Sequence, residues 1–447
     1  MRSDTLGWLS IARLGLVQAA LGAVVVLTTS TLNRVMVVEL ALPALVPGLL
    51  VALHYLVQLT RPRMGHGGDQ GGRRTPWIVG GMGVLSLGGA LAALATVWMG
   101  HARGPGVALA VLAYLLIGLG VSAGGTSLLV LLAKRVAPER RAGAATLVWL
   151  MMIAGFAVTA GITGRLLDPY SPERLLVVTT TVALLAWLMS VVALWGLEGH
   201  GNGAPVEAAA STQEFRAALR AVWADPTARR FAVFVFLSML AYSAQDLILE
   251  PFAGAVMGYT PGRSTSLSGL QHAGVLVGML MAAMAGRRWR GIHFGSLRAW
   301  TVGGCLVSAL AMAALSASGL VGPAWPFQPT VFVLGMANGA FSIAAIASMM
   351  QLATDGPAQR EGVRMGLWGA AQGVAFGLGG VIGTGACDLA RWLFVADGMA
   401  YASVFAFEAL MFLLAARIAW GRAPQRGGAC NPAGLAPPIS PRGMKGA

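Results

Sequence analysis

Charged side chains are scarce in this chain of 447 residues. Only 11% of the residues are Asp, Glu, Lys or Arg, whereas a soluble globular protein carries about 25%. Apolar residues make up 56% of the sequence, and the mean hydropathy is +0.71. This composition excludes a soluble enzyme, a disordered chain and a fibrous repeat. It favours a polytopic helical membrane protein, because lipid tolerates few charges and requires backbone polar groups to be bonded internally.

Several kinds of chemical site are also missing. The 3 cysteines lie far apart, without the paired spacing of a zinc or iron–sulfur site. No Walker loop is present, which excludes ATP hydrolysis by that motif. The aspartates never fall within four residues of one another, so the paired carboxylates that hold magnesium on a diphosphate in a membrane prenyltransferase are absent. We therefore expect no catalytic residue, no metal site and no cofactor required for catalysis.

Apolar runs of the length that crosses a bilayer, roughly 17–25 residues, recur throughout the chain. We place twelve of them at residues 14–38, 44–62, 76–99, 106–133, 144–165, 174–196, 230–250, 265–286, 297–318, 327–352, 363–386 and 397–420. They predict an all-α polytopic membrane protein with two six-helix bundles. The predicted domains are an N-terminal bundle (1–196), a cytoplasmic linker (197–229), a C-terminal bundle (230–421) and a disordered cytoplasmic tail (422–447).

The basic residues predict the orientation of the chain. If the N-terminus is cytoplasmic, 25 of the 31 Lys and Arg residues fall on the cytoplasmic side. Cytoplasmic loops of membrane proteins carry this excess of positive charge. We therefore expect both termini in the cytoplasm. The net charge of +14 then reflects membrane orientation, and we expect membrane lipid and no nucleic acid as a partner.

A short pattern recurs in the two halves of the chain. Residues 138–143 and 357–362 both read Pro-x-x-Arg-x-Gly, and their starts lie 357 − 138 = 219 residues apart. Both copies lie on the predicted cytoplasmic side, before a span rich in Gly and Ala. The matching position favours an internal duplication.

The loop between the second and third spans reads Gly-His-Gly-Gly-Asp-Gln-Gly-Gly-Arg-Arg over residues 65–74. It resembles the signature loop of the major facilitator superfamily, with Gln70 where that motif has Arg. Glycines permit a tight turn, and an Asp can bind a helix N-terminus or an Arg. Such a latch would bias a rocking motion of the two bundles; the alternative is a simple basic loop. The latch residues are Gly65, Asp69, Gly72, Arg73 and Arg74.

Polar residues inside the first and seventh spans are the next indication, because a charge there is costly unless it is paired or faces a cavity. In the first span, Gln18 and Asn33 fall on one helical face. In the seventh, Pro251 is expected to end the helix. We predict that Arg34 pairs with Asp246 or Glu250; the alternative is that Arg34 reaches the lipid headgroups.

Two histidines, His54 and His272, lie within predicted spans. A neutral imidazole is a good axial ligand for the magnesium of a chlorin, which makes both residues candidate pigment ligands. The alternative is that each one bonds a neighbouring helix.

Four short segments together resemble the PucC family of the major facilitator superfamily. They are Thr31–Leu40, Gln245–Phe252, Asn338–Ser342 and Gly366–Ala370. The similarity is closest to the branch encoded with bacteriochlorophyll-biosynthesis genes. The resemblance implies a major facilitator fold, a multi-pass location in a bacterial inner or intracytoplasmic photosynthetic membrane, and a central polar signature. The signature residues are Asn33, Arg34, Glu39, Gln245, Asp246 and Glu250.

The resemblance also implies a function and partners. The leading hypothesis is a non-enzymatic assembly factor for light-harvesting complexes, which handles bacteriochlorophyll as cargo. Its partners would be light-harvesting polypeptides and bacteriochlorophyll-biosynthesis enzymes. One alternative is a proton-coupled secondary transporter of a small molecule. The other is an accessory subunit of bacteriochlorophyll synthase.

Overall fold

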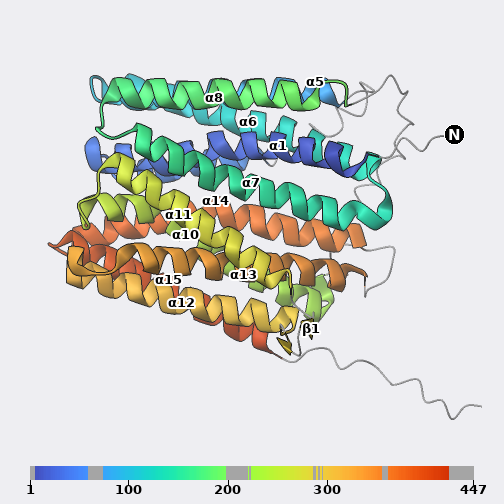
Figure 1. The fold of residues 1–447 in the computed structure, drawn as a ribbon. Coiled ribbons are helices and arrows are strands. Elements are labelled where there is room, and N and C mark those ends of the chain that lie inside the picture. Colours follow the sequence, from blue (N-terminus) through green and yellow to red (C-terminus); the bar gives the residue numbers. More distant parts are fainter. Residues whose placement is uncertain are drawn as a thin grey trace, which may run out of the picture.

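The fold is built almost entirely from helices (Figure 1). A computed structural model describes residues 6–58, 74–197, 220, 223–284, 288–289, 292–293, 295–354 and 361–421. The helices are α1 (Trp8–Val26), α2 (Leu32–Arg34), α3 (Leu45–Val57), α5 (Thr75–Met99), α6 (Arg103–Arg135), α7 (Arg141–Leu166), α8 (Pro172–Leu194), α10 (Pro226–Ala255), α11 (Pro261–Ala282), α12 (Leu297–Val321), α13 (Phe327–Thr354), α14 (Glu361–Leu393) and α15 (Asp397–Trp420). Two short 3-10 turns are η4 (Pro138–Arg140) and η5 (Gly322–Ala324).

Within the described residues, 10 helical segments are long and apolar enough to cross a membrane. The first of them, Trp8–Glu39, joins α1 and α2 into one segment. The predicted spans 44–62 and 265–286 overlap α3 and α11, which fall outside that set of 10. The chain is therefore a multi-pass helical membrane protein, and the count of twelve spans stays a prediction.

A small hairpin lies between α11 and α12, where the sequence indicated only a loop. Strand β1 (Arg288–Trp289) pairs antiparallel with β2 (Ile292–His293), and Arg288 faces His293 across the pair. The strands have 2 residues each, so the departure from an all-α chain is confined to a turn.

Each half of the chain has its own hydrophobic core. The larger cluster of the first half includes the fully buried Leu85 and Tyr114, and Leu247 of the second half joins it. The cluster of the second half includes Phe252 and Phe405, whose rings meet edge to face at 5.0 Å between centroids. In Figure 1 the helices of the first half (blue to green) lie above those of the second (yellow to red). Helix α1 begins and α15 ends at the same end of the bundle.

The two halves meet along two helix pairs, α3 with α14 and α7 with α11. A glycine in each pair makes room for a hydroxyl side chain of the other half: Gly48 lies against Thr384, and Gly164 lies against Ser266. A Cβ atom at either glycine would overlap the facing hydroxyl oxygen. The positions are related by 266 − 48 = 218 and 384 − 164 = 220 residues, close to the 219 of the sequence repeat. The contacts support the internal duplication.

Candidate functional site

The polar end of the first helical segment contains two π-helical turns, η1 (Leu27–Thr31) and η2 (Val35–Glu39), on either side of α2. A π turn rotates all later residues relative to a continuous α-helix, and such turns are frequent at functional sites. Tyr114 of α6 stabilises the first turn, because its hydroxyl donates to the Thr28 carbonyl at 2.7 Å. The buried residues Thr31, Asn33 and Arg34 follow directly.

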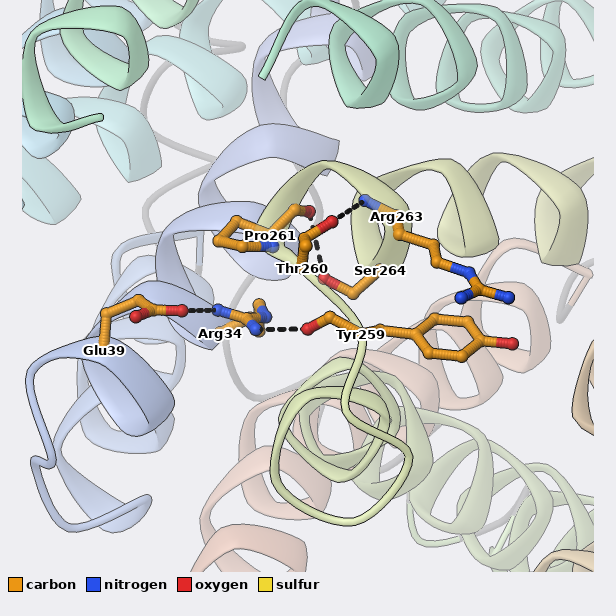
Figure 2. Close-up of polar contacts among 7 residues, drawn as sticks. All are labelled: Arg34, Glu39, Tyr259, Thr260, Pro261, Arg263 and Ser264. Atoms are coloured by element: carbon orange, nitrogen blue, oxygen red, sulfur yellow. Dashed lines mark hydrogen bonds and ion pairs between the residues drawn. The ribbon is translucent and has the colours of Figure 1, made fainter. Parts of the chain in front are cut away.

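Arg34 is the central charge of this region. Its side chain is only 2% exposed, and Nη1 lies 2.5 Å from Glu39 Oε1. Nη2 donates to the backbone carbonyl of Tyr259, in the turn between α10 and α11, at 2.7 Å (Figure 2). The predicted partners, Asp246 and Glu250, were therefore wrong: the structure pairs Arg34 with Glu39 and ties it to the second half through a carbonyl.

Three neighbours shape the space around this ion pair. Gly254 of α10 leaves room for the guanidinium, since a Cβ atom there would lie 2.8 Å from Arg34 Nη2. The ring of Tyr259 is covered by the Arg263 guanidinium, 4.1 Å from the ring centroid. Tyr170, between α7 and α8, is half-buried, and burial raises the pKa of its phenol; the Glu39 charge raises that pKa further and Arg34 lowers it. The ion pair thus acts on groups from both halves.

Glu250 belongs to a layer of hydroxyl contacts between the halves. Ser30 Oγ donates to Glu250 Oε1 and lies 3.0 Å from Ser268 Oγ. One residue further along, Thr31 and Thr265 share a hydroxyl hydrogen bond of 3.0 Å. The predicted site lacked Ser30 and Thr31. The run Thr-Thr-Ser-Thr at 28–31, inside an apolar span, was the signal that could have identified them.

Asn33 binds the backbone carbonyl of Leu247, which has no helical hydrogen bond because a proline lies four residues later. The prediction that Pro251 ends the seventh helix is wrong, because α10 continues to Ala255 with Pro251 inside. Proline lacks an N–H, so the carbonyl four residues earlier, that of Leu247, loses its helical hydrogen bond. Asn33 Nδ2 donates to this carbonyl at 2.6 Å. A proline in one half thereby creates the acceptor for an amide of the other half.

Asp246 and Gln245 lie apart from Arg34. Asp246 is partly exposed, and its Oδ1 accepts from Gln271 Nε2 of α11 at 3.2 Å. Gln245 is 0% exposed, and its side-chain amide interacts with the Asp246 carboxylate. The central polar signature therefore divides into two groups: Asn33, Arg34, Glu39 and Glu250 at the junction of the halves, and Gln245 with Asp246 on another part of α10.

A second polar contact joins the halves at α3 and α14. The Asp388 carboxylate accepts from the backbone N–H groups of Ala44 and Leu45, at 2.9 and 2.8 Å. It therefore caps the start of α3 from the opposite half, where the helix dipole favours negative charge. The sequence reading missed Asp388 because it ended the eleventh span at residue 386, whereas α14 continues to Leu393.

The two candidate pigment ligands differ in their hydrogen bonds. The ring Nε2 of His54 is in contact with Gln58 Nε2. His272 binds the Ser268 carbonyl through Nδ1 at 2.8 Å, and its ring meets Phe156 edge to face at 5.0 Å. A histidine that ligates a metal commonly donates its other nitrogen to a carbonyl in this way, so His272 fits an axial-ligand role better than His54. Among the described residues no group of three His, Cys, Asp or Glu could hold a metal ion.

The predicted latch lies mostly outside the described residues. Gly65, Asp69, Gly72 and Arg73 belong to the undescribed stretch 59–73. Arg74 is described: it is 5% exposed and immediately precedes α5. The latch stays a prediction.

The fold is similar to that of solved transporters. The crystal structure of a D-xylose–proton symporter matches with a TM-score of 0.68 at 14% identity, covering 93% of this chain and 97% of the symporter. A bacterial homologue of the human lysosomal transporter Spinster, inward-facing and unoccupied, matches with a TM-score of 0.64 at 16% identity, covering 92% and 95%. At these identities the likeness shows the fold alone, which this chain shares with both transporters.

Similarity to relatives in sequence extends over nearly the whole chain. The "Bacteriochlorophyll synthase 44.5 kDa chain" of Rhodobacter capsulatus is 53% identical over 433 residues, which cover 97% of this chain and 99% of the relative. "Protein PucC" of Cereibacter sphaeroides is 30% identical and covers 91% of this chain and 90% of the relative. The family model described as "PUCC protein" matches residues 31–422. The chain therefore belongs to the PucC family.

Proposed function

We propose that this protein is a non-enzymatic membrane assembly factor that handles bacteriochlorophyll, or delivers it to the polypeptides of light-harvesting complexes. The observation that carries the proposal is a combination: a transporter-like fold and nearly full-length similarity to a protein named as a bacteriochlorophyll synthase chain. The aspartates of the sequence lack the pairing that prenyl-diphosphate chemistry needs. We therefore interpret the relative's name as association with the pathway, with bacteriochlorophyll as cargo.

The proposed architecture has twelve spans in two six-helix bundles with both termini in the cytoplasm of a bacterial inner or intracytoplasmic membrane. The bundles are residues 1–196 and 230–421, with a linker at 197–229 and a tail at 422–447. The bias of basic residues and the separate hydrophobic cores of the two halves support this arrangement. The loop of Asp69 would lie on the cytoplasmic side as a latch.

In this proposal the junction around Arg34 holds the two bundles together at one end. Two of its contacts connect the halves: Ser30 binds Glu250, and Asn33 binds the Leu247 carbonyl. The ion pair of Arg34 and Glu39 lies within the first helical segment, Trp8–Glu39. Breaking the contacts between the halves would let the bundles separate and expose apolar surface to a pigment or to an antenna helix. His272 is the preferred axial ligand at the α7–α11 contact.

The deciding experiment is purification of the tagged full-length protein, in mild detergent, from a phototrophic bacterium that makes bacteriochlorophyll. We expect near-infrared bacteriochlorophyll absorbance and antenna or biosynthetic polypeptides to co-purify. His272→Leu should reduce the bound pigment, whereas His54→Leu should reduce it less. Recovery of neither pigment nor any of these polypeptides from correctly folded protein would count decisively against an assembly role.

A proton-coupled secondary transporter is the second candidate function. The fold likeness to a symporter and the two carboxyl groups within α10, the partly exposed Asp246 and the buried Glu250, favour it. Purified protein in liposomes would then take up a small solute when a proton gradient is imposed, and Asp246→Asn would abolish uptake. An accessory role in bacteriochlorophyll synthase remains as a third candidate. Tail attachment by a purified synthase should then depend on added protein.

A further inference from the structure

Glu408 has the most isolated carboxyl group in the described part of the second half. It lies near the middle of α15 (Asp397–Trp420), with 408 − 397 = 11 residues before it and 420 − 408 = 12 after it. At about 1.5 Å per residue, it is roughly 17 Å from either end of the helix and therefore close to the centre of a bilayer. Its side chain is 1% exposed, and neither oxygen has a hydrogen-bond partner among the described residues.

The surroundings of Glu408 are apolar and aromatic. Phe405 and Phe412 lie one turn before and after it on the same helix, and both are 0% exposed in the core of the second half. An unpaired carboxylate at the centre of a membrane is strongly unfavourable, whereas the neutral acid is far less so. Glu408 therefore needs either a cation or a proton.

No arginine with a described side chain on the helices around α15 supplies that cation. Helix α15 packs on α10, α12 and α14. Arg230 of α10 binds the Ile418 carbonyl, Arg298 of α12 binds the Gly421 carbonyl, and Arg391 of α14 binds Tyr401 and Asp397. All three lie toward helix ends, and Arg417 of α15 itself is exposed.

The charged group whose field acts on Glu408 is another acid, Asp246 of α10. The buried titratable groups of α12 and α14 are the thiols Cys305 and Cys387, which carry no positive charge. Glu408 and Asp246 are thus two acids on packed helices, and the described side chains of these helices supply no cation to balance them.

The two acids differ in access. Asp246 is partly exposed and bonded to Gln271, whereas Glu408 is closed off. Next to Asp246, the side-chain amide of Gln245 is fully buried and interacts with the Asp246 carboxylate. A buried amide of this kind can bind a carboxyl group in either protonation state, because it offers both a donor and an acceptor.

We propose that Asp246 and Glu408 form a proton-binding site in the second half, separate from the Arg34 junction. Glu408 holds the proton in the closed interior, and Asp246, the accessible member, exchanges it with the surroundings. The ligand is a proton, since a metal ion would need several further oxygen ligands that the described residues around Glu408 do not supply. The site goes beyond the proposed assembly role, because proton binding can be measured in the pigment-free protein.

Infrared spectroscopy of the purified full-length protein in detergent tests this site. At neutral pH the wild type should show the carbonyl band of a protonated carboxyl group in an apolar environment. Glu408→Gln, which has the shape of the neutral acid, should remove that band and leave the thermal unfolding midpoint unchanged or higher. Glu173→Gln, a change at an exposed glutamate in the first turn of α8, is the matched control and should leave the band intact.

A second measurement keeps the proposal testable if the variant does not fold. Wild-type protein labelled with ¹³C-carboxyl glutamate should show a shifted band, and protein labelled only in aspartate should not. Three results would overturn the proposal: no protonated-carboxyl band in the wild type, a band that survives in folded Glu408→Gln, or a band that disappears when sodium chloride is added at constant pH. The last result would assign the site to a metal cation.

Discussion

Two clusters of buried charge in this protein are balanced in opposite ways. Around Arg34 a guanidinium, a carboxylate and a backbone carbonyl lie together, so positive and negative groups are matched within the chain. Glu408 and Asp246 are two acids on the packed helices α15 and α10, and no cation pairs with either among the described residues. The first arrangement is fixed, because removal of one partner leaves the other uncompensated. The second can change its charge by taking up or releasing a proton.

The position of each cluster fits this difference. The Arg34 pair joins the end of the first segment to the turn after α10, where Glu39 is still 35% exposed. It therefore stabilises a contact between the halves. Glu408 lies buried on α15, and neither of its carboxyl oxygens makes a hydrogen bond among the described residues. The comparison predicts that neutralising substitutions will have very different effects at the two places.

The largest effect is expected at Arg34. Arg34→Met keeps an apolar stem of similar length but leaves Glu39 and the Tyr259 carbonyl without their donor. It should lower the free energy of unfolding by about 2–4 kcal/mol, toward the lower end because Glu39 is partly solvated. Glu408→Gln should change it by less than about 1 kcal/mol. Thermal and denaturant unfolding of the purified variants in one detergent measures both, and equal losses would refute the comparison.

The sequence made part of this site predictable and part of it not. Arg34, Glu39, Asp246 and Glu250 could be identified because charges inside apolar spans are rare. Their partners could not, because the π turns at 27–31 and 35–39 break the 3.6-residue period on which the expected face was based. Gln18, predicted on the face of Asn33, instead donates to the sulfur of Met152 on α7, at 3.2 Å.

Glu408 was missed although the same signal applied to it. It is a lone acid in the middle of the last predicted span, 397–420, outside the four segments that resemble the PucC family. The twelve predicted spans overlap helices well because long apolar runs determine helix positions. Contacts between distant helices, such as Asp388 with the start of α3, depend on tertiary packing, which local patterns do not encode.

The second prediction concerns the room that Gly254 leaves for Arg34. Gly254→Ala places a methyl group 2.8 Å from Nη2 in a backbone-fixed position, so the guanidinium must move away from Glu39 or the Tyr259 carbonyl. We expect a loss of about 1–3 kcal/mol by overpacking. Gly303→Ala in α12 is the matched control, because its new Cβ would meet nothing within 4 Å.

The control should be neutral or should stabilise α12 by up to about 1 kcal/mol, since Ala has the higher helix propensity. Unfolding midpoints of Gly254→Ala and Gly303→Ala, measured under the same conditions, test whether the space at Gly254 is required for Arg34. If both substitutions are tolerated equally, the tight fit of Arg34 is not what fixes this cluster.

The third prediction tests whether Pro251 creates the role of Asn33. Asn33→Ala should cost about 1–3 kcal/mol, because the Leu247 carbonyl is left unsatisfied in a buried site. In a Pro251→Ala background the new N–H can bind that carbonyl, so the same Asn33→Ala change should cost measurably less. A double-mutant cycle of unfolding free energies gives the coupling directly. Additive losses would show that Asn33 acts through some other contact.

The smallest effect is expected at Asp388, a carboxylate balanced by a helix terminus and not by an arginine. Asp388→Asn keeps an N-cap side chain but removes the negative charge from the start of α3, so we expect a loss of about 0.3–1 kcal/mol. The control is Asp168→Asn at the equivalent position of the first half, since 388 − 168 = 220. Asp168 is exposed, and its carboxylate lies against Gly262 at the start of α11, where no hydrogen bond among the described residues holds it. Its change should therefore cost less than that of Asp388, which accepts two backbone hydrogen bonds. Unfolding measured at low and high salt checks this, because the larger Asp388 effect should shrink as salt screens the dipole. A loss at Asp388 that is the same at both salt concentrations would mean that hydrogen-bond geometry, and not charge, holds α3 to α14. Asp388 would then not be an example of a carboxylate whose charge is balanced by a helix terminus.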